Sequence, residues 1–287
     1  MEDEEAYLLL LLSDSNLPTG SFVASSGLES YTTHGFLTSG RSGLGERLLS
    51  ITDFVRESLG TYAHTALPFV SDAHGEVQRQ LSKSPQQDIA TTIRRLLALD
   101  ELYETTTLNH VARRASRSQG VALLTLYTKG FSPPTLPDGT SSSTNPKLAS
   151  QLVDQLKLIV RREDTPGHLP ICWGVLTGAL GLSAERSRFL HLFLHARGLL
   201  SAAVRLNVIG PYAAQQLLLH SLRPLVAAEA QKCAGLRTGL RSLDSEGSAD
   251  GLFDEGVIDF EGPATTWPLG EILASRHDLQ HSRIFNS

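Results

Sequence analysis

The 287-residue chain has little of what secreted or membrane-inserted proteins usually carry. It has two cysteines, Cys172 and Cys233, which is too few for a disulfide framework and typical of a reduced compartment. The leucine run Leu8 to Leu12 is far shorter than the roughly 20 apolar residues that cross a bilayer. It also follows a cluster of acids rather than a basic segment, so it is a poor signal peptide. We therefore predict a cytoplasmic protein with no membrane partner.

Negative charge is concentrated in two short segments. Four acids stand at residues 2–5, and seven more lie between Leu243 and Gly262, a stretch without Lys or Arg. Removing these eleven charges from the formal net charge of −5 leaves +6 on the rest of the chain. So mild a positive charge is not the dense basic stripe of a nucleic-acid binder, and we predict no nucleic-acid partner.

Strand-like alternation of apolar residues is missing, whereas apolar residues recur at helical spacing. Residues 89–103 carry a broad apolar stripe, and residues 44–60 indicate another helix. Ser183 is placed to cap a third helix. Pro224 removes a backbone donor, which predicts a kink or break near Leu222. The prediction is an all-α fold, a compact multi-helix bundle.

Two polar segments interrupt the helical pattern. Residues 132–150 hold four prolines and five serines and predict a flexible, solvated loop. Residues 241–263 are rich in Gly, Ser and acids and predict a flexible linker. The chain then divides into a helical body over residues 1–240, the acidic linker, and a tethered C-terminal tail over residues 264–287.

Sequence motifs for catalysis are also missing. The glycine-rich stretch Gly40 to Gly45 lacks the lysine and the preceding strand of a phosphate-binding loop. The stretch Gly20-Ser21-Phe22 lacks the second glycine of a nucleophile elbow. We predict a protein that is not an enzyme, with no catalytic residue and no stably bound cofactor.

Two histidine pairs have four-residue spacing, so the members of each pair would share one helix face. His191 and His195 stand among apolar residues without the glutamate of HExxH, and we interpret them as histidines at the edge of the core. We expect His277 and His281 to be more exposed, on a helix face that docks on a partner. Neither pair has the spacing of a closed metal site, so we predict no metal ligand.

Two isolated charges stand near expected helix ends. Glu29 follows Gly27-Leu28 and is either a carboxylate favoured by the helix dipole or a surface acid that meets a basic partner. Arg205 either lays its aliphatic stem on apolar neighbours or presents its guanidinium to a partner's carboxylate or phosphate. The residues alone leave both alternatives open.

Three blocks of residues lie at the start, in the middle and at the end of the chain. They are Leu17-Pro18-Thr19-Gly20-Ser21-Phe22 with Gly27-Leu28-Glu29; Gly167-His168-Leu169-Pro170 leading to Gly174, then Ala202-Ala203-Val204-Arg205-Leu206 and Gly210; and Arg276-His277-Asp278 with Ser282-Arg283-Ile284-Phe285-Asn286-Ser287. In order and spacing these blocks resemble the UreF family of urease accessory proteins. Asp278, Ile284 and Asn286 stand where the family usually has Glu, Leu and Arg, and Pro211 replaces a usual Gln.

The resemblance implies an all-helical, non-catalytic scaffold for nickel insertion into apo-urease. It implies that the chain binds the accessory protein UreD (called UreH in some bacteria), recruits the GTPase UreG, which binds the GTP, and forms a homodimer. Nickel is then handled by the complex. On this resemblance the tail binds UreD, and two other residues contact UreG or urease. The tail residues are Arg276, His277, His281, Ser282, Arg283 and Phe285. The residues that contact UreG or urease are Glu29 and Arg205. The structural motif residues are Pro18, Gly20, Phe22, Gly27, His168, Pro170, Gly174 and Gly210.

Two alternatives remain on the residues alone. One is a helical metal-dependent enzyme that uses a histidine pair, and tight stoichiometric binding of Ni²⁺ or Zn²⁺ would favour it. The other is a generic helical adaptor unrelated to urease.

Overall fold

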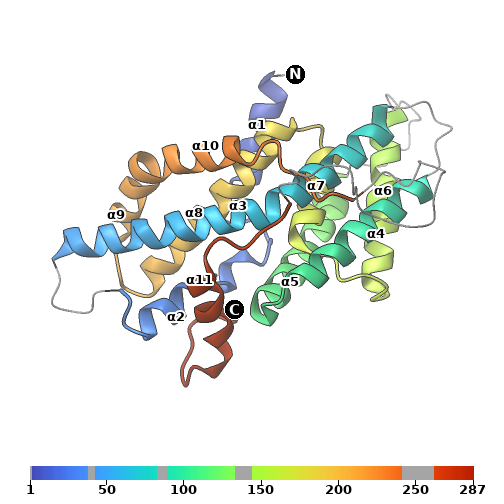
Figure 1. Cartoon of the computed structure of the whole chain (residues 1–287). Helices are drawn as coiled ribbons and strands as arrows, with labels where there is room; N and C mark the ends of the chain where they lie inside the picture. Colours follow the sequence, from blue (N-terminus) through green and yellow to red (C-terminus); the bar gives the residue numbers. More distant parts are fainter. Residues whose placement is uncertain (1, 38–42, 83–88, 133–143, 241–261) are drawn as a thin grey trace.

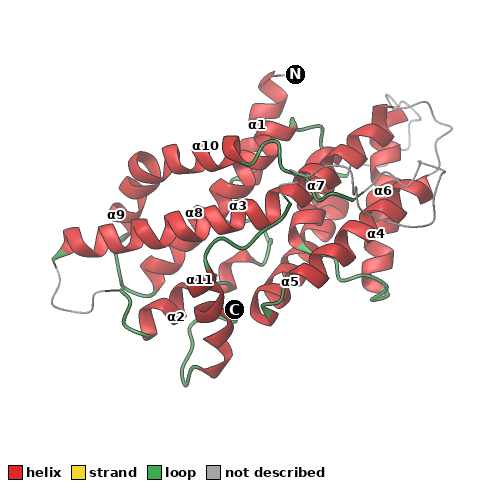
Figure 2. Ribbon diagram, in the orientation of Figure 1, coloured by secondary structure: helices red, strands yellow, loops and turns green. Residues whose placement is uncertain are grey.

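The computed structural model describes residues 2–37, 43–82, 89–132, 144–240 and 262–287, which form helices joined by loops (Figures 1 and 2). Within these ranges there is no strand, so the predicted all-α fold is confirmed. None of the described helices is long and apolar enough to cross a membrane. The expected linker lies outside the described residues except for its last two, and the core of the expected Pro/Ser-rich loop, residues 133–143, also lies outside them.

The elements follow one another along the chain, with short 3-10 (η1, η4) and π-helical (η2, η3) segments between the α-helices. They are α1 (Glu2–Leu12), η1 (Ser21–Val23), α2 (Leu28–Thr33), α3 (Leu44–Ser82), α4 (Ile89–Thr106), α5 (His110–Leu126), η2 (Tyr127–Phe131), α6 (Thr144–Arg161), α7 (Leu169–Ala179), α8 (Ala184–Arg205), α9 (Pro211–Gln216), η3 (Leu217–Leu222), α10 (Arg223–Lys232), α11 (Pro268–Ser275) and η4 (Arg276–Leu279).

Several helices expected from the sequence occur, although some boundaries differ. The stripe at residues 89–103 lies in α4, and residues 44–60 are only the first part of the much longer α3. The Ser183 hydroxyl accepts a hydrogen bond from the Arg186 N–H and so caps α8. One boundary was wrong: residues 144–150, expected in the loop, form the first turns of α6, where Pro146 is tolerated because a first-turn N–H needs no helical partner.

The helix before Pro224 is irregular, as its missing N–H predicts. Residues Leu217–Leu222 adopt a π-helix, and regular α-helix resumes at Arg223. The irregularity is therefore a widened turn in a helical run from α9 to α10.

The centre of the molecule is the contact between α3 and α7 (Figure 1). Gly174 of α7 lies directly on the α3 backbone: a Cβ atom there would be 2.7 Å from the Val70 carbonyl oxygen and 2.9 Å from the Ala73 Cβ. The two helices can therefore approach closely only because this position has no side chain. The same contact buries Val70, Ala73 and Val77 completely.

A buried polar cluster holds the start of α7. The Asp100 carboxylate accepts hydrogen bonds from the backbone N–H groups of Gly167, at 2.7 Å, and His168, at 2.8 Å. The fully buried His168 ring lies 2.7 Å from Glu104 Oε2 and 3.1 Å from Ser116 Oγ, and burial lowers its pKa. The first part of the middle motif block, from Gly167 to Gly174, thus lies in the interior, where its polar groups find partners on α4 and α5.

Candidate functional site

The first and last motif blocks lie side by side. Figure 1 shows the C-terminal residues next to α2, and α2 contacts both α11 and η4. Gly27, at the start of α2, has φ +86°, a conformation that favours glycine, and a Cβ atom there would lie 3.2 Å from the Ala274 Cβ of α11. Glycine at this position therefore serves both the turn and the close approach of the tail.

The carboxylate of Glu29 holds the backbone of the tail. Its Oε1 accepts a hydrogen bond from the Ile284 N–H at 2.5 Å, and its Oε2 accepts one from the Phe285 N–H at 3.2 Å. These residues are 255 and 256 positions away in the sequence. Glu29 is buried, so the expectation of a surface acid was wrong. The cause is that two tail N–H groups, which have no helical partner, need a buried acceptor.

The guanidinium of Arg205 lies between two aromatic rings. Its Cζ is 3.9 Å from the centre of the Phe22 ring and 4.1 Å from the centre of the Phe285 ring. Burial lowers its pKa, and its Nε is buried without a hydrogen-bond partner among the described residues. Cation–π attraction to the two rings compensates in part for this desolvation. The site thereby joins one residue from each of the three motif blocks.

Backbone and ion-pair contacts extend the attachment of the tail. The Asn286 N–H donates to the Val23 carbonyl at 2.9 Å. Asp278 accepts two hydrogen bonds of 2.8 Å from Arg114 of α5 and a further one of 2.9 Å from Arg283. The hydrogen bonds from Arg114 are the main reason why the pKa of Asp278 is lowered. The tail is therefore tied to α2, α5 and the loop that carries η1.

The six tail residues predicted to bind a partner fall into two groups. His277 and Phe285 are 1% and 3% exposed, so in this conformation they hold the tail rather than present it. The expectation that the tail extends away from the body, with His277 exposed, therefore differs from the structure. His277 and His281 also share no helix face, because η4 ends at Leu279 and Gln280 is extended. The exposed members of the set are Arg276, His281, Ser282 and Arg283.

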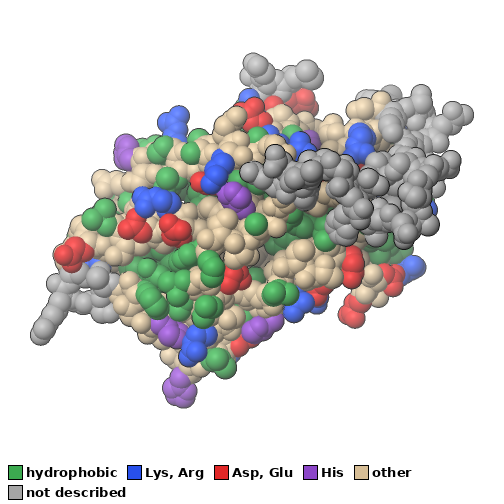
Figure 3. All heavy atoms as spheres, viewed as in Figure 1, with side chains coloured by type: hydrophobic (Ala, Val, Ile, Leu, Met, Phe, Trp, Pro, Cys, Tyr) green, Lys and Arg blue, Asp and Glu red, His purple; other side chains and the backbone are tan. Residues whose placement is uncertain are grey.

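Exposed apolar side chains surround the docked tail. Phe22 of η1 is 67% exposed and Ile284 of the tail is 62% exposed, and Ile272 and Leu279 are also exposed. Figure 3 shows hydrophobic side chains gathered over the region of α2 and α11. Apolar surface together with arginines is typical of a protein-binding surface.

The remaining motif residues are divided between this site and the interior. Gly20, with φ +72°, precedes η1 and carries Phe22 into position, whereas Pro18 is exposed. Pro170 is buried in the first turn of α7, and Gly210 precedes α9. Sequence reasoning missed Arg114, because α5 contains none of the motif blocks.

The first histidine pair lies at the edge of the core, as expected. His191 Nε2 is 2.8 Å from the Tyr62 hydroxyl, and His195 Nε2 is 3.0 Å from the Ser58 hydroxyl. Burial lowers the pKa of His191 to about 3. A neutral, hydrogen-bonded imidazole explains both residues without a catalytic role.

A separate groove lies between α1, α8 and α10. Its volume is about 560 Å³, and apolar side chains such as Leu9, Leu10, Phe189 and Phe193 line it. None of the candidate site residues predicted from the sequence lines this groove.

Comparison with known proteins identifies the family. The family model UreF matches residues 49–222, more than half of the chain. The chain is 46% identical to "Urease accessory protein 6" of Cryptococcus neoformans var. grubii, over 99% of this chain and 98% of that protein. It is 30% identical to an "Uncharacterized urease accessory protein UreF-like" of Schizosaccharomyces pombe (99% and 97% covered) and 32% identical to "Urease accessory protein F" of Oryza sativa subsp. indica (96% and 82% covered). The hypothesis of an adaptor outside this family is therefore wrong, and the chain belongs to the UreF family.

Proposed function

We propose that the chain is a non-catalytic scaffold in the maturation of urease, where it bridges UreD (UreH) and the GTPase UreG during nickel insertion into apo-urease. The names of its relatives, which are urease accessory proteins, support the link to urease. The observation that carries the scaffold role is the docked tail, held by the carboxylate of Glu29 and by Arg205 between two rings.

The docked tail supports binding because it is ordered before a partner arrives. A flexible segment loses conformational entropy when it binds, and a segment already held in place loses less. In this proposal Arg276, His281, Ser282 and Arg283 contact UreD, together with the exposed Ile284. His277 and Phe285 are buried beneath this surface, and their packing holds the exposed tail residues in place.

Glu29 and Arg205 are positioning residues in this proposal. Both contact the tail, Glu29 as a buried acceptor of its backbone N–H groups and Arg205 through the Phe285 ring, so in this proposal they affect UreG or urease through the shape of the tail. Nickel is cargo of the complex, and GTP is bound by UreG. A homodimer and a cytoplasmic location belong to the same proposal.

The test compares two matched substitutions of exposed apolar residues. Ile284→Asp places a charge on the tail surface, and Leu158→Asp makes the same change on α6, where the residue is 47% exposed. We expect Ile284→Asp to lower co-purification of UreD by at least about tenfold, because a charge buried at an interface without a partner costs more than about 1.4 kcal/mol. Leu158→Asp should leave it unchanged.

Glu29→Gln sharpens the test because it keeps the shape of the side chain and removes its charge. We expect faster proteolysis of the tail and weaker UreD binding, with the helical circular dichroism signal retained. Full UreD binding by Ile284→Asp and by a variant lacking residues 276–287 would show that the tail is not the UreD site.

A further inference from the structure

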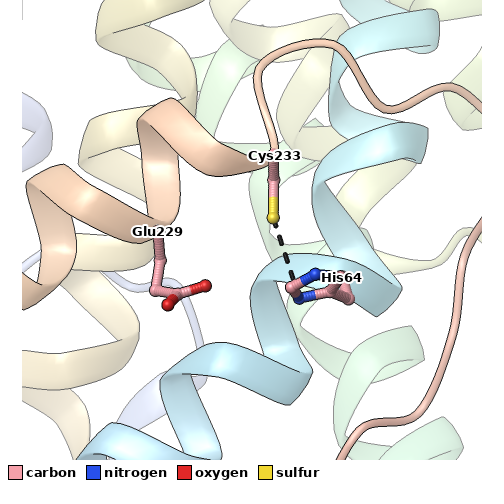
Figure 4. A group of neighbouring side chains, drawn as sticks. All are labelled: His64, Glu229 and Cys233. Atoms are coloured by element: carbon pink, nitrogen blue, oxygen red, sulfur yellow. Dashed lines mark hydrogen bonds between the residues drawn. The ribbon is translucent and has the colours of Figure 1, made fainter. Parts of the chain in front are cut away.

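Three side chains with metal-binding atoms meet where the end of α10 packs on α3. They are His64 of α3, Glu229 of α10 and Cys233, which directly follows α10 (Figure 4). One ligand atom from each lies within 4.8 Å of the other two. This cluster is separate from the docked tail and uses none of the residues of the motif blocks.

The spacing of the cluster follows from helix geometry. Glu229 and Cys233 are four residues apart and so share one face at the end of α10. α10 packs against α3, which brings His64 to that face, and Figure 4 shows the Glu229 carboxylate directed toward the imidazole. The His64 Nδ1 lies 3.8 Å from the Cys233 sulfur.

The Nδ1 atom of His64 also contacts the backbone of its own helix. It lies 2.9 Å from the carbonyl oxygen of Gly60, and because a carbonyl only accepts, this contact places a proton on Nδ1. The same Nδ1 lies 3.8 Å from the Cys233 sulfur. Metal binding beside Cys233 therefore requires either that Nδ1 gives up this proton or that the ring turns to present Nε2, in which case the Nδ1–H can keep a backbone acceptor, as metal-bound histidines typically do.

Glu229 has one oxygen that the protein leaves without a hydrogen bond. Its Oε2 is buried and accepts no hydrogen bond from the residues that the structure describes, and the ammonium of Lys232 lies 3.9 Å from it. Lys232 is itself largely exposed, so this ion pair compensates little for the buried charge. A buried carboxylate oxygen with so little compensation is a place where a cation would bind favourably.

We propose that His64, Glu229 and Cys233 bind a borderline divalent metal ion, Zn²⁺ or Ni²⁺. Imidazole, thiolate and carboxylate together suit these ions, whereas Mg²⁺ and Ca²⁺ prefer oxygen ligands alone. On binding, the Cys233 sulfur loses its proton to solvent and forms the metal–sulfur bond. Three protein ligands leave a fourth position open, from which the ion can exchange with another ligand.

The distances require a small closure of the cluster. Metal–nitrogen and metal–sulfur bonds of about 2.0 and 2.3 Å at a tetrahedral angle place two ligand atoms about 3.5 Å apart. The observed limit of 4.8 Å therefore has to shrink by about 1 Å. The side chain of Glu229, which is 23% exposed, has room for this adjustment.

The experiment measures metal binding to the full-length, reduced chain without any partner protein. We expect calorimetry to give one Zn²⁺ or Ni²⁺ ion per chain, and Co²⁺ to give the absorption band of a thiolate–cobalt bond. Cys233→Ser should abolish that band. Cys233→Ser and Glu229→Gln should each weaken binding by at least about 100-fold, which is the upper range for the loss of an outer partner of a metal site.

His281→Ala is the matched control, because it removes an exposed histidine from the tail and should leave affinity and stoichiometry unchanged. Mg²⁺ is the control ion and should not bind. The proposal is overturned if the wild-type chain binds neither Zn²⁺ nor Ni²⁺, or if Cys233→Ser binds them with wild-type affinity. Because no partner is present, either result leaves the scaffold role untouched.

Discussion

The α3–α7 contact and the tail–α2 contact are both close approaches of two segments, but different interactions hold them. The first depends on the absence of a side chain at Gly174 and on apolar residues that exclude water completely. The second depends on a carboxylate, Glu29, and on a guanidinium between two rings. The first contact allows almost no change in shape, whereas the second is made of a few directional bonds at the surface.

This difference bears on function. Core packing is cooperative, so the α3–α7 contact opens only when the protein unfolds. A peripheral segment held by a few hydrogen bonds opens locally at a much lower free-energy cost. The docked tail is therefore the region where a partner can alter the structure without unfolding the bundle. Three measurements test whether the core contact and the docked tail differ in this way.

The largest effect is expected in the core. Gly174→Ala places a Cβ atom 2.7 Å from the Val70 carbonyl, which forces the helices apart and should cost roughly 2–3 kcal/mol of unfolding free energy. Gly75→Ala is the control, because a Cβ atom there meets nothing within 4 Å and should stabilise α3 by up to about 1 kcal/mol. Urea denaturation measures both. Equal stability of the two variants would mean that the α3–α7 contact is looser than described.

An intermediate effect is expected from pH, and it should separate the two regions. Burial lowers the pKa of His191 to about 3, so below the ordinary value near 6.5 the unfolded chain binds more protons than the folded one. The stability of the bundle should therefore be full above pH 6.5 and should fall, by up to about 1.4 kcal/mol per pH unit from this group, as the pH decreases toward 3.

The tail should respond at a lower pH. The pKa of Asp278 is lowered, chiefly by the hydrogen bonds from Arg114. Its contribution to the stability of the docked tail is therefore complete above the ordinary aspartate pKa near 3.9, and it is lost as the pH falls below that value. Urea denaturation should show that the bundle is less stable at pH 5 than at pH 7. The amide exchange rates of Ile284 and Phe285, corrected for the intrinsic pH dependence of exchange, should be the same at both pH values. His191→Gln should reduce the loss of stability, and part of it should remain because burial also lowers the pKa of His195, to about 4. A tail that loosens between pH 7 and pH 5 would contradict this assignment.

The smallest effect is expected at the rim of the tail. Arg114→Ala removes both hydrogen bonds to Asp278, but Arg114 is about half exposed, so the loss should be no more than about 1 kcal/mol. Amide exchange of the tail should accelerate modestly, with global stability unchanged. Arg56→Ala, which breaks an exposed ion pair on α3, should leave the tail amides unaffected. A global loss of stability in Arg114→Ala would place the tail within the cooperative core.

Local patterns were enough to predict much of the helical architecture. The apolar stripe of α4, the cap at Ser183 and the break before Pro224 each depend on neighbours a few residues away, and the structure has all three. The helix that starts at Thr144 was missed because its first residues are polar and include Pro146, so that they resemble a loop when packing is ignored.

The candidate site could be predicted only in part. The motif blocks drew attention to Glu29, Arg205 and Phe285, but their spacing does not indicate that these residues contact one another. The exposure of His277 was predicted wrongly and the environment of Glu29 was left open, because a short charged segment is exposed in an isolated chain and becomes buried only when the tail covers it. The cluster of His64, Glu229 and Cys233 was missed because two distant helices supply its members.

The helical class and the residues that mark the family could be predicted from the chain alone, because both depend on short-range periodicity and on motif order. Three features appear only in the folded molecule: the chain ends meet, Glu29 accepts hydrogen bonds from tail amides, and Arg205 contacts two aromatic rings. The physical reason is that these contacts join residues up to 256 positions apart, and their geometry exists only after the helices have packed.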